Sequence, residues 1–336
     1  MAQRILEVRA EQLRLAAPFR ISGYVFEHTD AIVATISEGD CHGRGEASGV
    51  FYLGDDKAHM LAGIEANRDA IEAGISRFEL QHLMPPGGAR NALDCALWEL
   101  EAAQAGRPVW ALAGLDPPRP LVTTFTLGAD DPEVMAGGAR NYAEARAIKV
   151  KLTGEIEIDI ERVEAVRAAR PDVWLGVDAN QGFARRDLDW LVEMLVEQNV
   201  SLLEQPLPRG SEADLEGYKS RIPIAADESA LGLADMAGLA DRFDVVNIKL
   251  DKCGGLTEGL AMAAEARRLG LGLMVGNMVG SSLAMAPAYL LGQLCDFVDL
   301  DGPTFLTSDR QPGVVYKDGL ISCGEDVWGV PGKLAA

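Results

Sequence analysis

The stretch "AIKVKLTGEIEIDIERVEAVRAARPDVWLGVDAN" (residues 147–180) decides the fold. It opens with a short, β-branched apolar run, continues with a helical pattern, and closes with a second apolar run. A strand, a helix and a second strand in this order form a βαβ unit, in which the two strands run parallel. The stretch therefore predicts an α/β architecture built on a parallel sheet.

The same alternation extends over residues 118–311. Helix-like segments separate eight apolar runs, which are "LVTTFTLG" (121–128), "AIKVKL" (147–152), "VWLGVDAN" (173–180), "VSLLEQP" (200–206), "IPIAADES" (222–229), "VVNIKLD" (245–251), "LGLMVGN" (271–277) and "FVDLDGP" (297–303). Eight βα units most simply close on themselves. We predict a modified (β/α)8 barrel of the TIM type, with residues 118–311 as the catalytic domain.

Residues 1–117 show a different pattern, which predicts an N-terminal α+β capping domain. Strand-like runs at 4–15, 30–36 and 41–48 precede "ARNALDCALWELEAAQAG" (89–106), where apolar residues recur at helical spacing. The tail, residues 312–336, contains a hairpin pattern with a "KDG" turn. We expect this tail to join the capping domain and its hairpin to return to that domain's sheet.

Composition excludes several classes of partner. The formal net charge is -20 and the pI is near 4.6, which argues against a nucleic-acid partner, because binding phosphates requires clustered positive charge. The start of the chain lacks the layout of a signal peptide, and the sequence has no run of about 18 apolar residues that could form a membrane-spanning helix. The five cysteines form no CxxC motif. We expect a cytoplasmic protein with a small-molecule substrate, and the sequence is compatible with a homo-oligomer.

Polar residues close almost every apolar run of the predicted barrel. Catalytic groups of such barrels lie at the C-terminal ends of the strands. The residues at these ends are Lys149 and Lys151, Asp178 and Asn180, Glu204, Asp227 and Glu228, Lys249, and Asp299 and Asp301. The four histidines all lie in the first quarter of the chain, so the barrel must use lysines and carboxylates for its chemistry.

Three of these carboxylates predict a metal site. Asp178, Glu204 and Asp227 close consecutive strands, about one βα unit apart, and should converge at the barrel mouth. Three carboxylates confined together stay ionised when a cation joins them, and oxygen ligands suit Mg²⁺ or Mn²⁺. A ring of solvated loop acids is the alternative interpretation.

The lysines predict acid–base chemistry beside that metal. Lys151 and Lys249 belong to the second and sixth strands, so in an eight-stranded barrel they face each other across the mouth. With a substrate carboxylate on the metal, one lysine removes the α-proton, the metal stabilises the enediolate, and the other lysine protonates the opposite face. Lys149 points to the same side as Lys151 and disfavours its protonation. For "KVK" taken alone, a salt-bridged pair at a strand edge is the simpler interpretation.

The motifs at these positions resemble those of the enolase superfamily, in its muconate-lactonising-enzyme subgroup. They are "KVK" (149–151), "DAN" (178–180), "EQP" (204–206), "DES" (227–229) and "NIKLDKCGG" (247–255). The resemblance covers essentially the whole chain and is greatest to the dipeptide epimerases of the L-Ala-D/L-Glu epimerase type. It implies Mg²⁺ on Asp178, Glu204 and Asp227, and acid–base roles for Lys151 and Lys249.

A motif on the eighth strand indicates which class of substrate the protein binds. "DLDG" (299–302) resembles the DxD motif of dipeptide epimerases, in which two acids grip the substrate's free ammonium. We expect Asp299 and Asp301 to lie across the mouth from the metal, so that a zwitterion spans the distance; a solvated turn is the alternative. The resemblance also suggests substrate contacts by Thr126, Asn277 and Met278, with Asn180 and Glu228 supporting the metal ligands.

The loop "PFRISGYVFEHT" (18–29) concerns the side chain of the epimerised residue. L-Ala-D/L-Glu epimerases carry an arginine about five residues after "PF", where this chain has Gly23 or Tyr24. Neither residue offers a bidentate cation for a γ-carboxylate. With Phe26, Phe51 and Tyr52, Tyr24 predicts an apolar pocket, although Arg20 and His28 could add polarity. The alternative is that these aromatic rings simply pack the loops onto the barrel.

These patterns together predict an isomerase. The expected reaction is Mg²⁺-dependent epimerisation of L-Ala-L-Xaa dipeptides with a neutral or hydrophobic second residue, by two-lysine 1,1-proton transfer through an enediolate. Alternatives within the subgroup are an N-acylamino-acid racemase, an o-succinylbenzoate synthase or a cycloisomerase. A catalytically silent barrel that acts as a binding protein, and a phosphate-binding barrel enzyme, are alternatives from other classes.

Overall fold

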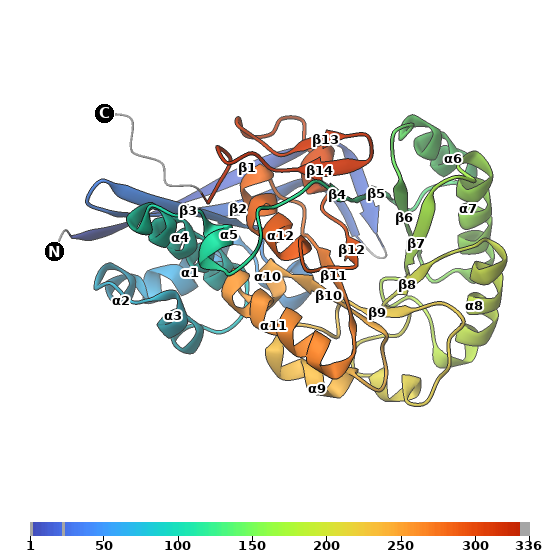
Figure 1. Ribbon diagram of the computed structural model, residues 1–336. Helices are drawn as coiled ribbons and strands as arrows, with labels where there is room; N and C mark the ends of the chain where they lie inside the picture. Colours follow the sequence, from blue (N-terminus) through green and yellow to red (C-terminus); the bar gives the residue numbers. More distant parts are fainter. Residues whose placement is uncertain (1–2, 22–23, 330–336) are drawn as a thin grey trace.

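A computed structural model describes residues 3–21 and 24–329 of the chain. An eight-stranded parallel sheet with the order β12-β11-β10-β9-β8-β7-β6-β5 forms the barrel (Figure 1). Its strands are β5 (Thr124–Leu127), β6 (Ala147–Lys151), β7 (Trp174–Asp178), β8 (Leu202–Glu204), β9 (Ile224–Ala226), β10 (Val245–Lys249), β11 (Gly272–Gly276) and β12 (Phe297–Val298). Each predicted apolar run contains one of these strands, so the predicted barrel is confirmed.

Helices follow the strands and cover the outside of the barrel (Figure 1). They are α6 (Pro132–Asn141), α7 (Ile156–Ala169), α8 (Leu188–Glu197), α9 (Met236–Leu239), α10 (Leu250–Cys253), α11 (Leu256–Leu269) and α12 (Ser282–Gly292). Every residue of β6 and β10 is buried, as expected for parallel strands that are covered on both faces. The buried lysines of these two strands therefore need partners inside the protein.

The barrel closes between its first and last strands through side chains. β12 and β5 stand at the two ends of the sheet order. Across this seam Thr124 Oγ1 donates to Asp299 Oδ1 (2.5 Å), and the Thr126 backbone N–H donates to Asp301 Oδ2 (2.6 Å). Two buried acids thus take over the hydrogen bonding that a continuous ladder would supply.

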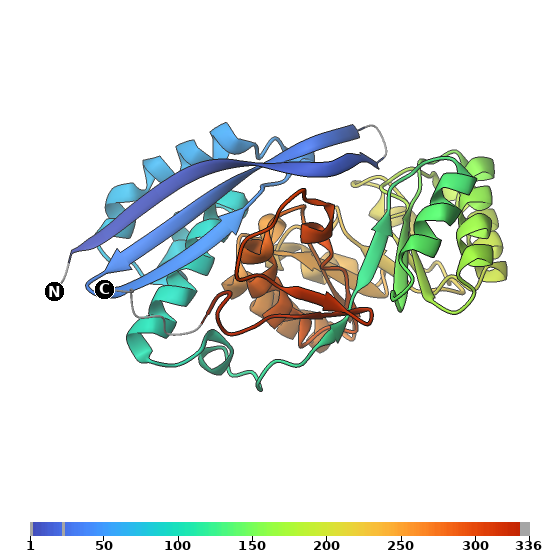
Figure 2. The same ribbon diagram turned by 90° about the horizontal axis from the view of Figure 1, so that it is seen from above.

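The N-terminal part forms a three-stranded antiparallel sheet with helices packed on one face (Figure 2). Its elements are β1 (Arg4–Ile21), β2 (Tyr24–Glu38), β3 (Cys41–Ala47), α1 (Lys57–Ala66), α2 (Arg68–Glu72), α3 (Arg77–Leu83), α4 (Gly88–Ala105) and α5 (Val109–Leu112). Helix α4 lies so close to β3 that a Cβ atom at Gly45 would be 2.0 Å from the carbonyl oxygen of Ala92. The expected α+β capping domain is present, while the boundary at residues 117 and 118 stays a prediction.

The β1–β2 hairpin extends from this sheet toward the barrel strands (Figure 2). The rings of Phe19 and Phe305 have centroids 4.8 Å apart, and the backbone N–H of Ala129 donates to the carbonyl oxygen of Arg20 (3.3 Å). The capping domain therefore reaches the C-terminal ends of the barrel strands, where the candidate site lies.

The C-terminal hairpin was assigned to the wrong sheet. It consists of β13 (Val315–Lys317) and β14 (Leu320–Ser322), as predicted, but β14 pairs with β4 (Leu121–Val122). These strands form a separate sheet beside the barrel, because β4 directly precedes the first barrel strand and offers a free edge. The segment after the hairpin does contact the capping domain, where Trp328 Nε1 donates to the carbonyl oxygen of Arg44 (2.8 Å).

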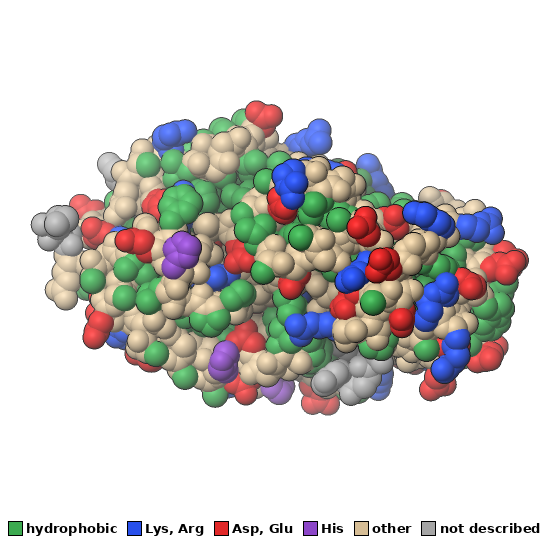
Figure 3. Space-filling model, turned by 90° about the horizontal axis from the view of Figure 1, so that it is seen from below, with side chains coloured by type: hydrophobic (Ala, Val, Ile, Leu, Met, Phe, Trp, Pro, Cys, Tyr) green, Lys and Arg blue, Asp and Glu red, His purple; other side chains and the backbone are tan. Residues whose placement is uncertain are grey.

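The surface of the protein carries charged side chains of both signs. On the face shown in Figure 3, acidic and basic side chains are intermixed, with no continuous basic patch over the described residues. Among those residues, no helix is long and apolar enough to cross a membrane.

Candidate active site

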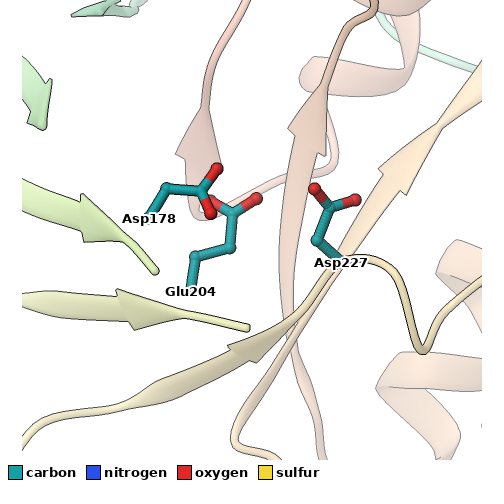
Figure 4. Close-up of side chains that lie close together, drawn as sticks. All are labelled: Asp178, Glu204 and Asp227. Carbon is teal, nitrogen blue, oxygen red and sulfur yellow. The ribbon is translucent and has the colours of Figure 1, made fainter. Parts of the chain in front are cut away.

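Three carboxylates meet at the ends of consecutive strands. Asp178 ends β7, Glu204 ends β8, and Asp227 directly follows β9. Asp178 and Glu204 are paired in the β7–β8 register, which sets them side by side, and Asp227 lies next to them (Figure 4). All three are buried, and one oxygen from each lies within 4.8 Å of the others. The strand spacing predicted that these three carboxylates converge, and their positions confirm it.

The two lysines proposed as acid and base approach this cluster from two ends. Lys151 Nζ lies 2.6 Å from Asp178 Oδ2, and Lys249 Nζ lies 2.7 Å from Asp227 Oδ2. Lys151 comes from β6 and Lys249 from β10, with β7, β8 and β9 between them in the sheet. The ammonium groups therefore flank the carboxylates on opposite sides, and both line one pocket.

Lys149 lies deeper, and it links several acids. Its Nζ is 2.7 Å from Glu204 Oε2, 2.7 Å from Asp299 Oδ2 and 3.2 Å from Asp178 Oδ2. Burial opposes its charge, but Asp299 and Glu204 outweigh burial and raise the pKa of Lys149 well above its usual value. Lys149 is thus a fixed positive charge beneath the site.

The three carboxylates differ in how much positive charge surrounds them, and their pKa values differ accordingly. Burial acts to raise the pKa of Asp178, but Lys151 and Lys149 lower it to about 2. Burial is likewise outweighed at Asp227, where Lys249 and Lys252 hold the pKa well below its usual value. At Glu204, by contrast, burial and the charge of Asp178 raise the pKa to about 7. Glu204 is therefore the carboxylate that most needs an added positive charge.

The cluster fits a divalent cation. Oxygen donors from three buried carboxylates are the set that Mg²⁺ prefers. Glu204 Oε2 is buried beside Lys149, yet the angles there do not make a hydrogen bond, so this oxygen keeps a lone pair for a ligand. Asp178, Glu204 and Asp227 are the residues that would hold the ion.

Each carboxylate is oriented by a second group. Asn247 Nδ2 donates to Glu204 Oε1 (2.8 Å), Lys252 Nζ donates to Asp227 Oδ1 (2.5 Å), and the Asn180 backbone N–H donates to Asp178 Oδ1 (3.0 Å). Of these, Asn247 and Lys252 were not predicted. Asn247 stands two residues before Lys249 on β10, so strand alternation could have indicated that it faces the same side.

The strand order places β12 four strands from β8, as expected for Asp299 across the mouth, but the Asp299 side chain comes nearer to the metal ligands than this placement suggests. The single ammonium group of Lys149 contacts both Asp299 and Glu204, which sets Asp299 beside the metal ligands. Both acids on this strand are buried, and they bond across the barrel seam, so the solvated-turn alternative is wrong. Burial and the neighbouring Asp299 raise the pKa of Asp301 to about 7.

The pocket above the lysines is largely apolar. Its lining includes Leu15, Phe19, Phe26, Phe51, Tyr52 and Met278, which come from the β1–β2 hairpin, the loop between β3 and α1, and the loop after β11. Among the described residues, Lys151 and Lys249 are the cationic side chains that line it. Arg20 turns away toward Asp130, with Nη1 3.7 Å from Oδ2, and His28 is exposed.

The remaining predicted contacts divide into two groups. Asn180, Glu228, Asn277 and Met278 line the pocket. Thr126 lies instead beside a separate cavity near Arg20, while Gly23 and the side chain of Tyr24 lie outside the described part of the chain.

Family models match both parts of the chain. The mandelate racemase/muconate lactonizing enzyme N-terminal domain matches residues 4–114, and the enolase C-terminal domain-like family matches residues 134–320. The chain belongs to the enolase superfamily. Its motifs were identified correctly from the sequence, and its relatives make it an isomerase of the racemase and epimerase class.

Curated relatives of this superfamily member differ in substrate. The L-Ala-D/L-Glu epimerase of Escherichia coli is 37% identical, over 95% of this chain and 99% of the relative. An N-acetyl-D-glutamate racemase of Pseudoalteromonas is 43% identical, over 73% of this chain and 76% of the relative. A hydrophobic dipeptide epimerase of Roseobacter litoralis is 35% identical, over 94% and 95% respectively.

Solved structures of similar proteins contain dipeptides. An enolase family member from Agrobacterium tumefaciens, with bound sodium and L-Ala-L-Glu, has a TM-score of 0.92 and 42% identity, covering 97% of this chain and 100% of that one. A dipeptide epimerase from Methylococcus capsulatus, complexed with Mg and L-Arg-D-Lys, has a TM-score of 0.89 and 31% identity, covering 96% and 97%.

Proposed function

We propose that this protein is a Mg²⁺-dependent dipeptide epimerase in which Lys151 and Lys249 exchange the α-proton of the second residue. The observation that carries the proposal is the placement of two ammonium groups at opposite ends of one carboxylate cluster, in one pocket. Two bases on opposite faces of a carbon are what inversion of its configuration requires. The dipeptides bound by the Methylococcus and Agrobacterium proteins support this substrate class.

The proposed reaction is a 1,1-proton transfer. One lysine, as the free amine, takes the α-proton, and the C–H electron pair moves into the carboxyl group to give an enediolate. The opposite lysine, as an ammonium group, returns a proton to the other face of the same carbon. Lys149 remains protonated beneath the site and keeps positive charge near the developing negative charge.

Asp178, Glu204 and Asp227 would hold the ion. When bound, Mg²⁺ supplies positive charge that stabilises the substrate carboxylate as negative charge accumulates on it. Mn²⁺ shares the preference for oxygen ligands and is the alternative to test. Turnover after exhaustive chelation would refute the metal requirement.

Asp299 and Asp301 remain the proposed partners of the substrate's free ammonium group. Burial and Asp299 raise the pKa of Asp301 to about 7, so an added positive charge beside this pair would be favourable. Because Lys149 already contacts Asp299, Asp301 is the acid of this pair that lacks an ion-pair partner among the described residues. Comparing free with N-acetylated dipeptides tests this role.

The pocket supports preference for an apolar second residue. Phe19, Phe26 and Phe51 contribute rings to its lining, whereas Arg20 is paired with Asp130. A glutamate side chain placed there would lose hydration without gaining a bidentate cation. The test is kcat/KM for L-Ala-L-Phe, L-Ala-L-Leu and L-Ala-L-Glu, measured side by side. A clear preference for L-Ala-L-Glu, the dipeptide in the Agrobacterium structure, would overturn this part of the proposal.

N-acylamino-acid racemisation is the second candidate, because one relative is an N-acetyl-D-glutamate racemase. That substrate has no free ammonium group for the acids of the eighth strand. N-acetylated amino acids turned over faster than free dipeptides would favour this candidate. The cytoplasmic location and a homo-oligomeric state stay predictions.

A further inference from the structure

The second capping-domain loop, which joins β3 to α1 and contains Phe51 and Tyr52, is tied to the barrel beside Lys249. Asp251, two residues after Lys249, accepts hydrogen bonds on Oδ1 from the backbone N–H groups of Ser48 and Gly49, each 2.9 Å long. Ser48 Oγ donates to the carbonyl oxygen of Val279 (2.8 Å), in the loop after β11. The start of the loop is therefore held by two different barrel segments.

The loop is also braced internally. The backbone N–H groups of Leu53 and Asp55 both donate to the carbonyl oxygen of Val50 (2.9 and 3.2 Å), which closes a tight turn around Phe51 and Tyr52. Gly49 has φ +70°, and a Cβ atom there would be 2.1 Å from the carbonyl oxygen of Asp55. This close approach leaves the turn little freedom, so the position of Tyr52 is set by the backbone.

The hydroxyl group of Tyr52 has an unusual environment. It is buried and has no hydrogen-bond partner in the part of the chain that the structure describes. Tyr52 lines the same pocket as Lys151, Lys249 and Asp227. Burial, and then the nearby charges of Asp227, Glu228 and Asp178, raise the pKa of Tyr52 well above its usual value. The phenol is therefore a buried hydrogen-bond donor that faces the pocket.

We propose that the Tyr52 hydroxyl group donates a hydrogen bond to the carboxylate of the dipeptide. This inference rests on the proposed function and adds to it a direct protein donor on the metal side of the pocket. Tyr52 lines the pocket together with Asp227, which is one of the carboxylates proposed to hold the ion. The substrate carboxylate must lie there, and it is an acceptor that a buried donor without a partner needs.

The carboxylate is common to all dipeptides, whereas the second side chain is not. Tyr52→Phe keeps the ring and removes the donor, so it should lower kcat/KM by about 10- to 100-fold, the range for losing a hydrogen bond to a charged group. The loss should be the same for L-Ala-L-Leu, L-Ala-L-Phe and L-Ala-L-Met. Phe51→Leu, which alters the neighbouring apolar wall, should affect these three dipeptides unequally.

Two measurements separate this role from structural effects. The dissociation constant of Mg²⁺, measured by calorimetry without substrate, should be unchanged in Tyr52→Phe, since the phenol is not a ligand of the ion. Tyr289→Phe is the matched control, because the Tyr289 hydroxyl group donates to the carbonyl oxygen of Arg119 (2.7 Å), and Tyr289 packs in the hydrophobic core. This control should retain kcat/KM.

The outcomes are distinguishable. A uniform fall with unchanged Mg²⁺ affinity supports the inference. An active wild-type enzyme with an unchanged Tyr52→Phe variant overturns it alone, as does a loss confined to one side chain or a weakened affinity for Mg²⁺. A wild-type enzyme that turns over no dipeptide overturns the proposed function, and the inference with it.

Discussion

Asn247→Leu is the substitution that most directly tests the metal site through a residue outside the ligand set. Asn247 is fully buried, and its amide donates to Glu204 Oε1 at 2.8 Å. Leucine has the same branched shape and number of heavy atoms but no donor, so Glu204 would lose this partner inside the protein. Groups that orient metal ligands typically contribute about 10- to 100-fold to metal affinity. We expect the dissociation constant of Mg²⁺ to rise by that factor.

The pH dependence of Mg²⁺ binding gives an independent magnitude. Burial and Asp178 raise the pKa of Glu204 to about 7, so below that pH the carboxyl group holds a proton that the ion must displace. Wild-type affinity should therefore fall about fivefold between pH 7 and pH 6, and it should level off above pH 8. Without the Asn247 amide, the ionised form of Glu204 loses a stabilising donor, which shifts this fall toward higher pH.

Calorimetric titration of the metal-free protein with Mg²⁺ at pH 6, 7 and 8 measures both effects. Asn91→Leu is the matched control, because Asn91 is also buried but lies in helix α4 of the capping domain. The reasoning would be refuted if Asn247→Leu bound Mg²⁺ as tightly as the wild type at every pH, or if the control lost as much affinity. In either case, Mg²⁺ binding by Glu204 would not depend on the Asn247 amide.

Three other predictions concern substrate and loop. Lys151→Ala and Lys249→Ala should each abolish epimerisation while retaining one-sided α-proton exchange with opposite diastereomers in D₂O; identical exchange patterns would contradict the two-base assignment. Asp301→Asn should weaken binding of free dipeptides by about 1.5 to 3 kcal/mol and leave Mg²⁺ binding intact, which calorimetry measures. Asp251→Ala should speed hydrogen exchange at the Ser48 amide, whereas Asp251→Asn, which keeps the acceptor oxygen, should not; equal exchange in both variants would argue against the anchor.

The metal cluster was predictable because it depends on strand order alone. Asp178, Glu204 and Asp227 end consecutive strands, and parallel neighbours bring such residues together whatever the stagger of the barrel. Asp299 depends on the stagger, which sets which residues of distant strands share a layer. Apolar spacing does not encode the stagger, so the contact of Asp299 with Lys149 could not be predicted from the sequence.

Some contacts follow from tertiary packing and left no local signal. The hairpin pattern at residues 313–323 predicted the turn correctly but not its partner, since β4 offers only two residues, Leu121 and Val122. Lys252 follows the acid–base lysine in a short helix, and its contact with Asp227 requires α10 to begin directly at the end of β10. A lysine in a buried helical turn was the available clue, because such a charge needs a partner.

The acids of the eighth strand hold the barrel seam together and are also proposed to bind the substrate, so a test must separate these two roles. Asp301 accepts the Thr126 backbone N–H across the seam that closes the barrel, so an alanine there would leave a buried donor unpaired and disturb β5. Asparagine retains a carbonyl oxygen for that N–H and removes only the negative charge. A binding loss in Asp301→Asn that is restricted to substrates with a free ammonium group therefore reports on recognition, whereas an equal loss for N-acetylated substrates would show that the residue acts through the seam.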